Sequence, residues 1–304
     1  MKKALLAYNP KSGSQFLSQN LDYIAESFKQ LEVILELYRI DKDEDLIEYV
    51  KKTDADFIVG SGGDGTIGQV IASMLHYKVD KPFMALGMGT SNNFTRNIED
   101  TKSITSEEQA RQIIVDAYHG KVEKFDIGWV NEKMIFLTSL AGGNFIDTSF
   151  ETDKKLKSVL GGLAYYIKPL ADLTNVKSYD IKVTVDGKVY QERIVVFVIV
   201  NGSAVGNFDN FVNDADMSDG EMELVLIKEA SAFENLSLVG TIAKGEDVTE
   251  LENVVVIKGK DFLIECDEQM PISLDGERGP ELPIRAKVVP QAISVMVAQQ
   301  NIEE

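Results

Sequence analysis

The sequence of 304 residues contains little cysteine, proline or histidine: one Cys, 7 Pro and 2 His. A lone cysteine, Cys266, excludes an intrachain disulfide, and no CxxC motif is present for a zinc site. No stretch approaches the roughly 20 apolar residues of a membrane-spanning helix. The apolar run after Met1 ends at Tyr8, which is too short for the core of a signal peptide. These absences predict a cytoplasmic protein whose contact with a membrane is peripheral.

Basic residues are also scarce relative to acidic ones. Lys and Arg number 31 against 49 Asp and Glu, which gives a net charge of −18 at pH 7. Such a field repels nucleic acids and anionic bilayers unless a local basic patch overrides it. We therefore expect no nucleic-acid partner. The apolar fraction of 44% and the length are sufficient for two domains, each with a buried core.

The pattern of apolar residues changes near Asp126. Before it, short apolar runs at residues 4–8, 33–38, 57–59 and 83–86 alternate with helical periods, which predicts a parallel α/β layer. After it, strand-like runs are joined by turns, and the Asp186-Gly187 pair predicts a two-residue hairpin. We predict a Rossmann-like α/β nucleotide-binding domain over residues 1–126 and a mainly-β domain over residues 127–291. The apolar stretch within residues 292–304 can return to either domain.

A glycine-rich turn links the third predicted strand to the following helix. Its backbone amides can converge on a phosphate, because glycines permit close approach and the helix start is electropositive. The turn also satisfies the G-x-G-x-x-G dinucleotide pattern, but it lies on the third strand and contains Asp64. A carboxylate there repels a bare pyrophosphate, so we expect Mg²⁺ beside it. No G-x-x-x-x-G-K-[ST] motif is present, and the alternative interpretation is a turn shaped only for packing.

Two further polar loops follow the first and fourth predicted strands. The carboxyl ends of parallel strands share one edge of a sheet, so these loops and the glycine-rich turn can line one nucleotide pocket. The candidate nucleotide-binding residues of the three loops are Asn9, Pro10, Lys11, Ser12, Gly13, Gly62, Gly63, Asp64, Gly65, Thr66, Ile67, Gly68, Gln69, Gly89, Thr90 and Asn92.

These loops resemble those of the diacylglycerol kinase catalytic-domain family, in its soluble bacterial form. Residues 62–66 match its GGDGT motif, residues 9–13 its NPxSG motif and residues 88–92 its GT-x-N loop. The GGDGT motif is also similar to loops of NAD kinases and phosphofructokinases, so by itself it indicates an ATP-dependent kinase. Similarities at residues 155–158, 164–168 and 274–277 favour the lipid-kinase branch, and the resemblance covers nearly the whole chain.

The resemblance implies a function and a fold for each half. It implies a phosphofructokinase-like nucleotide loop in the α/β domain, and a C-terminal β-sandwich that takes the lipid. The expected reaction is transfer of the γ-phosphoryl group of ATP to a lipid hydroxyl, with diacylglycerol as the leading acceptor. Sphingoid bases, ceramide and phosphatidylglycerol are alternative acceptors. A nucleotide-binding regulatory protein is the alternative from another class, and a homodimer is left open.

The resemblance also implies roles for three acidic residues. Asp64 would hold Mg²⁺, and Glu277 falls where the family has its proposed proton acceptor, with Asp275 as the nearby alternative. A carboxylate within about 3 Å of the lipid hydroxyl can take its proton. Which of Asp64 and Glu277 is the general base stays open. Without the resemblance, residues 275–277 are typical of a hairpin turn with an exposed charge.

A second, structural Mg²⁺ site is implied at residues 216–221. Its ligands would be the side chain of Asp219 and the backbone carbonyls of Asp216 and Glu221. Asp126 matches a family aspartate that is linked to the Mg²⁺ network. The alternative interpretations are an ordinary acidic turn before a strand and a turn at the domain junction.

Two departures from the family pattern remove carboxylates. Asn93 stands where the family has an aspartate, and Gln69 where it commonly has a glutamate. Asparagine and glutamine can donate and accept hydrogen bonds but bring no charge to a metal ion. These departures are the reason for the regulatory alternative.

Access to the membrane needs a local basic face on this acidic protein. The best candidate is an apolar helical pattern flanked by Lys154, Lys155, Lys157 and Lys168. At about 1 kcal/mol for each basic residue near an anionic surface, four lysines can offset the distant negative field. We expect the protein to be cytoplasmic and transiently peripheral to the inner face of the membrane. The alternative is a solvated helix with one buried apolar side.

Overall fold

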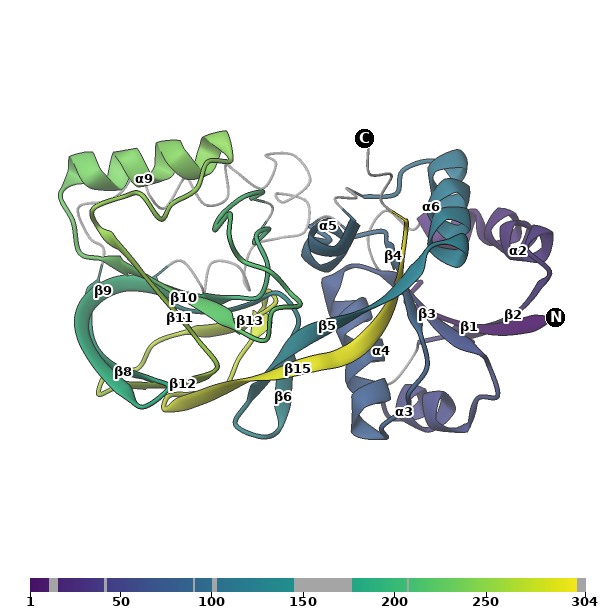
Figure 1. Cartoon of the computed structure of the whole chain (residues 1–304), viewed down its shortest axis with the longest axis horizontal. Coiled ribbons are helices and arrows are strands. Elements are labelled where there is room, and N and C mark those ends of the chain that lie inside the picture. Colours follow the sequence, from purple (N-terminus) through teal and green to yellow (C-terminus); the bar gives the residue numbers. More distant parts are fainter. Residues whose placement is uncertain are drawn as a thin grey trace. The chain divides into compact units, whose positions relative to one another are not determined.

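The computed structural model describes residues 1–10, 16–40, 43–89, 91–99, 103–144, 177–206 and 208–299. Two compact units divide the chain: an N-terminal unit of Met1–Phe125 with Gln291–Glu304, and a C-terminal unit of Asp126–Pro290. The chain passes from one unit to the other within two strands, β5 (Lys121–Val130) and β15 (Ile284–Val297) (Figure 1). The C-terminal stretch therefore belongs to the first unit, and each unit is described by itself.

The N-terminal unit is built on a parallel sheet in the order β4-β3-β1-β2, with the end of β15 added beside β4. The strands are β1 (Lys2–Tyr8), β2 (Val33–Arg39), β3 (Phe57–Gly62) and β4 (Phe83–Gly87). Parallel pairing joins β1 to both β2 and β3, and β3 to β4. Four parallel strands were expected at these places, and this prediction is confirmed; the addition of β15 was not specified.

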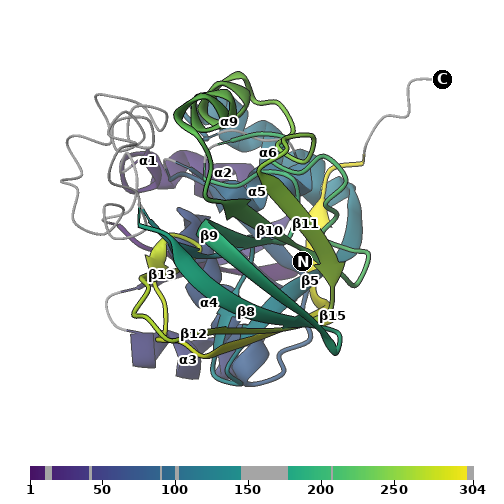
Figure 2. The ribbon, with the colours of Figure 1, turned by 90° about the vertical axis from the view of Figure 1, so that its left-hand side faces the viewer.

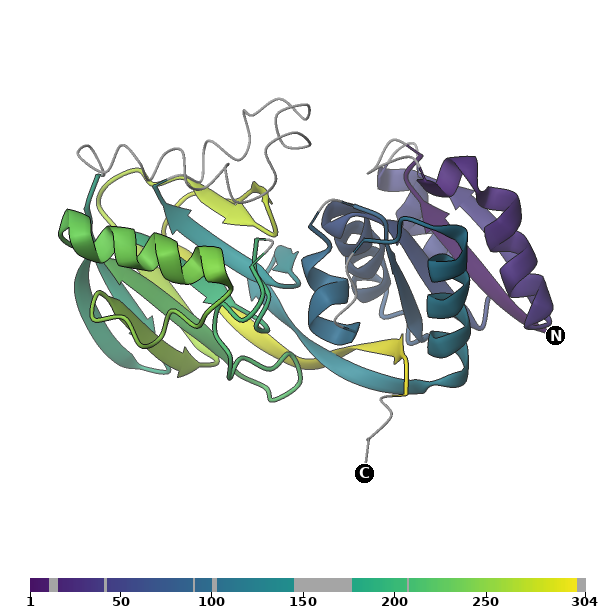
Figure 3. The same ribbon diagram turned by 90° about the horizontal axis from the view of Figure 1, so that it is seen from above.

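Helices cover both faces of this sheet, which explains why its central strands are buried along most of their length (Figures 1 and 3). On one face α2 packs against α6, and on the other α3 packs against α4. Ile24 and Phe28 of α2 enter the same core as Leu6 and Val59 of the sheet. The helices are α1 (Phe16–Gln19), α2 (Leu21–Gln30), α3 (Asp43–Lys52), α4 (Asp64–His76), α5 (Asn93–Glu99) and α6 (Glu107–His119).

The C-terminal unit is mainly antiparallel β-structure (Figure 2). Its strands follow the order β14-β13-β7-β9-β8-β12-β15; β10 pairs with β9 and β11, and β5 pairs with β15 and β6. Its elements are β6 (Met134–Phe136), β7 (Ser139–Gly143), β8 (Tyr179–Val185), β9 (Lys188–Val200), β10 (Met222–Lys228), α9 (Ala232–Lys244), β11 (Val254–Gly259), β12 (Asp261–Cys266), β13 (Ile272–Leu274) and β14 (Glu277–Arg278).

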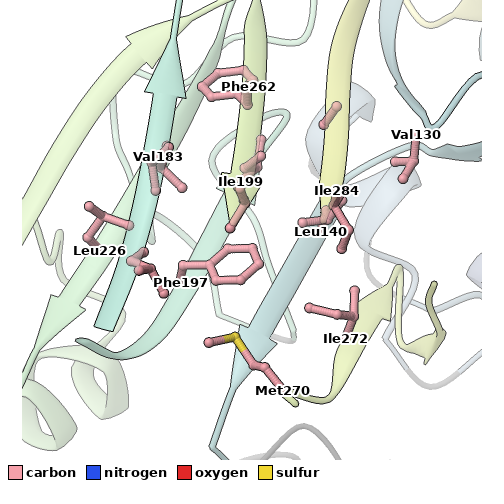
Figure 4. Packing of buried hydrophobic residues seen from close by; sticks show 14 of the residues in the cluster. Val130, Leu140, Val183, Phe197, Ile199, Leu226, Phe262, Met270, Ile272 and Ile284 are labelled. Atoms are coloured by element: carbon pink, nitrogen blue, oxygen red, sulfur yellow. The ribbon is translucent and has the colours of Figure 1, made fainter. Parts of the chain in front are cut away.

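Strand β9 lies between two hydrophobic cores. Successive side chains of a strand point to opposite faces, so Phe197 and Ile199 enter one core (Figure 4) and Val198 and Val200 the other. Helix α9 contributes Leu238 to the second core. This strand is therefore buried on both faces along its second half, as its burial pattern shows.

The predicted hairpin between β8 and β9 is present. Asp186 and Gly187 both have positive φ, 48° and 82°, as a two-residue type I′ turn requires, and Val185 pairs with Lys188 across it. Within the described part of the chain, no helix combines the length and the apolar character needed to cross a bilayer. The basic helical pattern with Lys154, Lys155, Lys157 and Lys168 lies outside the described residues.

Candidate functional site

Two glycine loops meet at the carboxyl edge of the parallel sheet. Strand register places Gly62 beside Gly87, and the N–H of Met88 donates to the carbonyl of Gly62 at 2.8 Å. A Cβ added to Gly89 would lie 2.5 Å from the Cα of Gly63, which no side chain can tolerate without movement of the backbone. Gly62 has a φ of 154°, a value that glycine adopts readily. The loops after β3 and β4 therefore pack backbone against backbone.

Asp64 joins these two loops through its side chain. It is the first residue of α4 and is partly exposed, and its Oδ1 accepts the N–H of Phe94 at 3.0 Å. The N–H groups of Thr66 and Ile67 both donate to the carbonyl of Gly63. The first N–H groups of α4 lie at the positive end of the helix, which attracts an anion.

Asn92 braces the loop that follows β4. Its side chain is fully buried, its Oδ1 accepts the N–H of Gly89 at 2.8 Å, and its Nδ2 donates to the carbonyl of Gly89 and to the hydroxyl of Ser103. The Ser103 hydroxyl also donates to that carbonyl at 2.6 Å. The structure thus places Asn92 inside the loop, where it fixes the shape of the loop. Ser103 has no place in the motifs and was missed by the sequence analysis.

The loop after β1 follows the same edge of the sheet. Tyr8 at the end of β1 pairs with Ser61 of β3, and the half-buried Asn9 and Pro10 come directly after it. Gly68 and Gln69 are half-buried on α4, and Asn93 is buried at the start of α5. Among the candidate nucleotide-binding residues, Lys11, Ser12, Gly13 and Thr90 lie outside the described residues.

In the C-terminal unit, Asp275 is held by four hydrogen bonds. Its carboxylate accepts the N–H groups of Leu137, Thr138 and Ser139 at 2.6, 2.8 and 2.9 Å, and the hydroxyl of Thr138 at 2.8 Å. Burial raises the pKa of Asp275, and these hydrogen bonds oppose that rise. Both carboxylate oxygens are therefore engaged, and the side chain anchors the β13–β14 hairpin to the segment before β7. No local pattern of residues indicates this anchor, because its partners lie more than 130 positions away.

Glu277 is exposed and lies two positions after Asp275, directly after the turn of the same hairpin. It pairs with Leu274 across a turn in which Asp275 and Gly276 have φ values of 47° and 90°. The hairpin thus fixes the half-buried Asp275 by hydrogen bonds and presents Glu277 to solvent. An exposed carboxylate on a firmly anchored turn can accept a proton from a substrate that reaches it.

Asp126 and the acidic loop at residues 216–221 form a second polar region of this unit. Asp126 is fully buried, its carboxylate accepts the N–H of Gly220 at 2.6 Å, and its own N–H donates to the carbonyl of Met217 at 2.7 Å. The carboxylate of Asp216 accepts the N–H and the hydroxyl of Ser218. Asp126 therefore holds this loop in place.

Asp219 of this loop pairs with a lysine. Its Oδ1 accepts the N–H of Glu221 at 2.9 Å, and its Oδ2 lies 2.6 Å from the ammonium of Lys258. That ammonium also lies 3.1 Å from the carboxylate of the buried Glu223. Burial raises the pKa of Glu223 and Lys258 opposes the rise, while the hydrogen bond to Asp219 raises the pKa of Lys258.

Two Mg²⁺ ions are expected, one with the nucleotide beside Asp64 and one at the acidic loop of residues 216–221. Across the described ranges, no three acidic, histidine or cysteine side chains gather as metal ligands. A Mg²⁺ ion that arrives with a nucleotide needs few protein carboxylates, because phosphates and water supply most of its ligands, so Asp64 alone fits that role. At the acidic loop, one oxygen of Asp219 accepts the N–H of Glu221 and the other pairs with Lys258. Each carboxylate oxygen has a second lone pair, so a Mg²⁺ site at this loop stays a prediction.

Both halves of the chain match known protein families. Residues 3–130 match the diacylglycerol kinase catalytic domain, and residues 148–297 match the YegS C-terminal NAD kinase beta sandwich-like domain. The fold is therefore an α/β domain with a parallel sheet followed by a β-sandwich domain, as expected. A structure of a diacylglycerol kinase from Bacillus anthracis has this fold, with a TM-score of 0.75 and 21% identity over 97% of each chain.

Similar sequences extend over the full length. A diacylglycerol kinase of Staphylococcus carnosus is 29% identical, covering 97% of this chain and 94% of the relative. A diacylglycerol kinase of Bacillus subtilis is 26% identical, covering 100% and 99%. The chain belongs to the diacylglycerol kinase catalytic-domain family of lipid kinases. Membership implies ATP as the phosphoryl donor and a lipid as the acceptor, and the resemblance in the motifs is thereby confirmed.

Proposed function

We propose that this lipid kinase transfers the γ-phosphoryl group of ATP to the free hydroxyl of diacylglycerol and produces phosphatidic acid. The observation that carries this proposal is the packing of Gly63 against Gly89 beside Asp64. Because Gly63 and Gly89 have no side chains, phosphate oxygens can come close to the amide N–H groups of the two loops. The names of the full-length relatives support diacylglycerol as the acceptor.

In the N-terminal unit, the chain binds and orients the triphosphate. In this proposal, the loops after β1, β3 and β4 would line the phosphates, and Asp64 would hold the Mg²⁺ that accompanies them. Phosphoryl transfer needs positioning and neutralisation of charge more than covalent assistance, so this arrangement supplies most of what the reaction requires. Asn93 contributes hydrogen bonds without charge, so we expect weaker metal binding than an aspartate would give.

In the C-terminal unit, Glu277 accepts the proton of the lipid hydroxyl. The O–H bond breaks, its proton passes to the Glu277 carboxylate, the oxygen bonds to the γ-phosphorus, and ADP leaves with the electrons of the broken P–O bond. Asp275 is a positioning residue in this proposal, because its oxygens are occupied by the backbone of residues 137–139.

The remaining predictions concern the location of the protein, its contact with the membrane, a second metal ion and its oligomeric state. We propose a cytoplasmic enzyme that visits the inner face of the membrane, with the lysines near residues 154–168 as its docking face. We also propose that the N-terminal domain binds the nucleotide and the C-terminal domain binds the lipid. A second Mg²⁺ at the side chain of Asp219 and the backbone carbonyls of Asp216 and Glu221 stays a prediction, as does a homodimer.

The test is phosphorylation of a lipid panel in mixed micelles with radiolabelled ATP, followed by thin-layer separation. The panel contains diacylglycerol, a sphingoid base, ceramide and phosphatidylglycerol. We expect label in phosphatidic acid, no label with Asp64→Ala, and a higher rate with Asn93→Asp. Asp22→Ala, which removes an exposed carboxylate from α2, is the matched control and should retain activity.

Two outcomes would contradict the proposal. Label in another lipid would replace diacylglycerol as the acceptor. Tight ATP binding without lipid-stimulated turnover would favour a regulatory role, which the replacement of carboxylates by Asn93 and Gln69 suggests as the second candidate.

A further inference from the structure

Asn201 joins three separate segments of the C-terminal unit, although no motif contains it. It comes directly after β9 and is fully buried. Its Nδ2 donates to the carbonyl of Asp126 at 2.9 Å and to the carbonyl of Leu137 at 2.7 Å. Its backbone N–H donates to the carbonyl of Thr138 at 2.8 Å. One residue therefore connects β5, the segment before β7 and the end of β9.

Both segments that Asn201 connects lead to groups of the proposed site. Residues 137–139 donate four hydrogen bonds to Asp275, which anchors the turn before Glu277. On the other side, the Asp126 carboxylate holds the N–H of Gly220 in the acidic loop. The Asn201 side chain is thus the hydrogen-bonded link between the strand of Asp126 and the anchor of the Glu277 hairpin.

The chemistry of this link is specific to an amide. Two carbonyl acceptors fix the orientation of the side chain, because only the NH₂ group can donate to both of them. The remaining atom, Oδ1, is buried and has no hydrogen-bond partner within the described residues. An unpaired buried oxygen is unfavourable, and an apolar residue would avoid it. The same replacement would leave the carbonyls of Asp126 and Leu137 without their donor.

We propose that Asn201 is a positioning residue for phosphoryl transfer, which sets the place of the Glu277 hairpin by fixing residues 137–139 to the strand of Asp126. This inference rests on the proposed function, in which Glu277 accepts the proton. Asn201 acts through Asp275 and its backbone anchor and does not itself touch the reacting atoms. Displacement of a reacting group by about 1 Å can reduce a rate by about 100-fold.

The variant Asn201→Ala tests this role against Asn253→Ala. Asn253 is a matched control: it is also buried in this unit, and its Nδ2 lacks a hydrogen-bond partner among the described residues. We expect Asn201→Ala to lower kcat at least about tenfold with the KM for ATP unchanged, since the nucleotide loops are untouched. Asn253→Ala should leave kcat unchanged. Asn201→Ser retains one donor and replaces the alanine variant if that variant does not fold.

Hydrogen exchange provides a readout that does not depend on activity. The amides of residues 137–139 should exchange faster in Asn201→Ala and at the wild-type rate in Asn253→Ala. Equal losses of kcat in the two variants, or unchanged exchange at residues 137–139, would overturn the inference. Failure of the wild-type protein to phosphorylate any lipid would instead refute the proposed function, and the exchange result would then still decide whether Asn201 holds this segment.

Discussion

The contact between the two glycine loops makes a sharp prediction for Gly89→Ala. A Cβ at this position would lie 2.5 Å from the Cα of Gly63 and 2.8 Å from the Oδ1 of Asn92. Carbon atoms in contact normally stay about 3.5–4.0 Å apart, so the loops after β3 and β4 must separate by about 1 Å. The added methyl group would clash with the backbone of Gly63, and backbone atoms cannot rotate away as the end of a flexible side chain can.

The size of the effect follows from two opposing terms. Overpacking of this kind typically costs about 1–3 kcal/mol, and replacing glycine by alanine recovers about 0.4–1 kcal/mol from the unfolded chain. We expect Gly89→Ala to lower the free energy of unfolding by about 1–2 kcal/mol, which is a fall of about 2–8 °C in melting temperature. ATP affinity should fall as well, because the phosphate loops move apart.

Gly63→Ala is the matched control for this contact. Its Cβ would lie 3.4 Å from the Cα of Gly89, and its φ of −86° is accessible to alanine, so we expect a change in stability of less than about 0.5 kcal/mol. Chemical denaturation measures the stability of both variants, and titration calorimetry measures ATP binding. Equal stability of Gly89→Ala and Gly63→Ala would refute the packing of the two loops described above. Unaltered ATP affinity in Gly89→Ala would place the triphosphate elsewhere.

Three further predictions concern acidic residues of the C-terminal unit. Asp275→Ala leaves three backbone N–H groups without an acceptor and should cost about 3 kcal/mol in chemical denaturation; a loss below about 1 kcal/mol would contradict the anchor. Glu277→Gln should lower kcat about 100-fold or more and leave the melting temperature unchanged, because the side chain is exposed; retained kcat would remove its proposed role. Burial raises the pKa of Glu223, so the folded protein holds this proton more tightly than the unfolded chain and stability falls as pH rises above about 4.5. Glu223→Gln should flatten this fall in denaturation curves measured between about pH 4 and about pH 7, and parallel curves for the two proteins would contradict it.

The N-terminal unit was predictable from the sequence because its signals are local. A buried parallel strand is a short apolar run, and a loop that must approach another backbone needs glycine at the point of contact. Gly89 illustrates the second rule, since a Cβ there would lie 2.5 Å from the Cα of Gly63 in the other loop. The pairing of β15 with β4 lacked such a signal: Val295 and Phe83 are partners far apart in the chain, and the apolar run alone fits either unit.

The polar interior of the C-terminal unit was not predictable for the same reason. Asn201 contacts Asp126 and Leu137 across 75 and 64 positions, and Asp275 contacts Thr138 across 137 positions. Thr138 stands in neither a charged cluster nor a glycine turn. The Asn201-Gly202 pair does indicate a turn, but a turn signal does not show which distant carbonyls the Asn201 side chain contacts. Their part in the site emerges only when the strands bring their backbone groups together.

The two acids of the β13–β14 hairpin show how the fold can separate roles that the sequence leaves equivalent. In the sequence, Asp275 and Glu277 are carboxylates two positions apart, and either can serve as a proton acceptor. In the structure, the first is half-buried and accepts four hydrogen bonds, and the second is exposed. The four hydrogen bonds of Asp275 fill most of the acceptor positions of its carboxylate, whereas the exposed Glu277 is accessible to a substrate hydroxyl. This difference is why we propose Glu277 as the base and Asp275 as the residue that holds the turn of Glu277 in place.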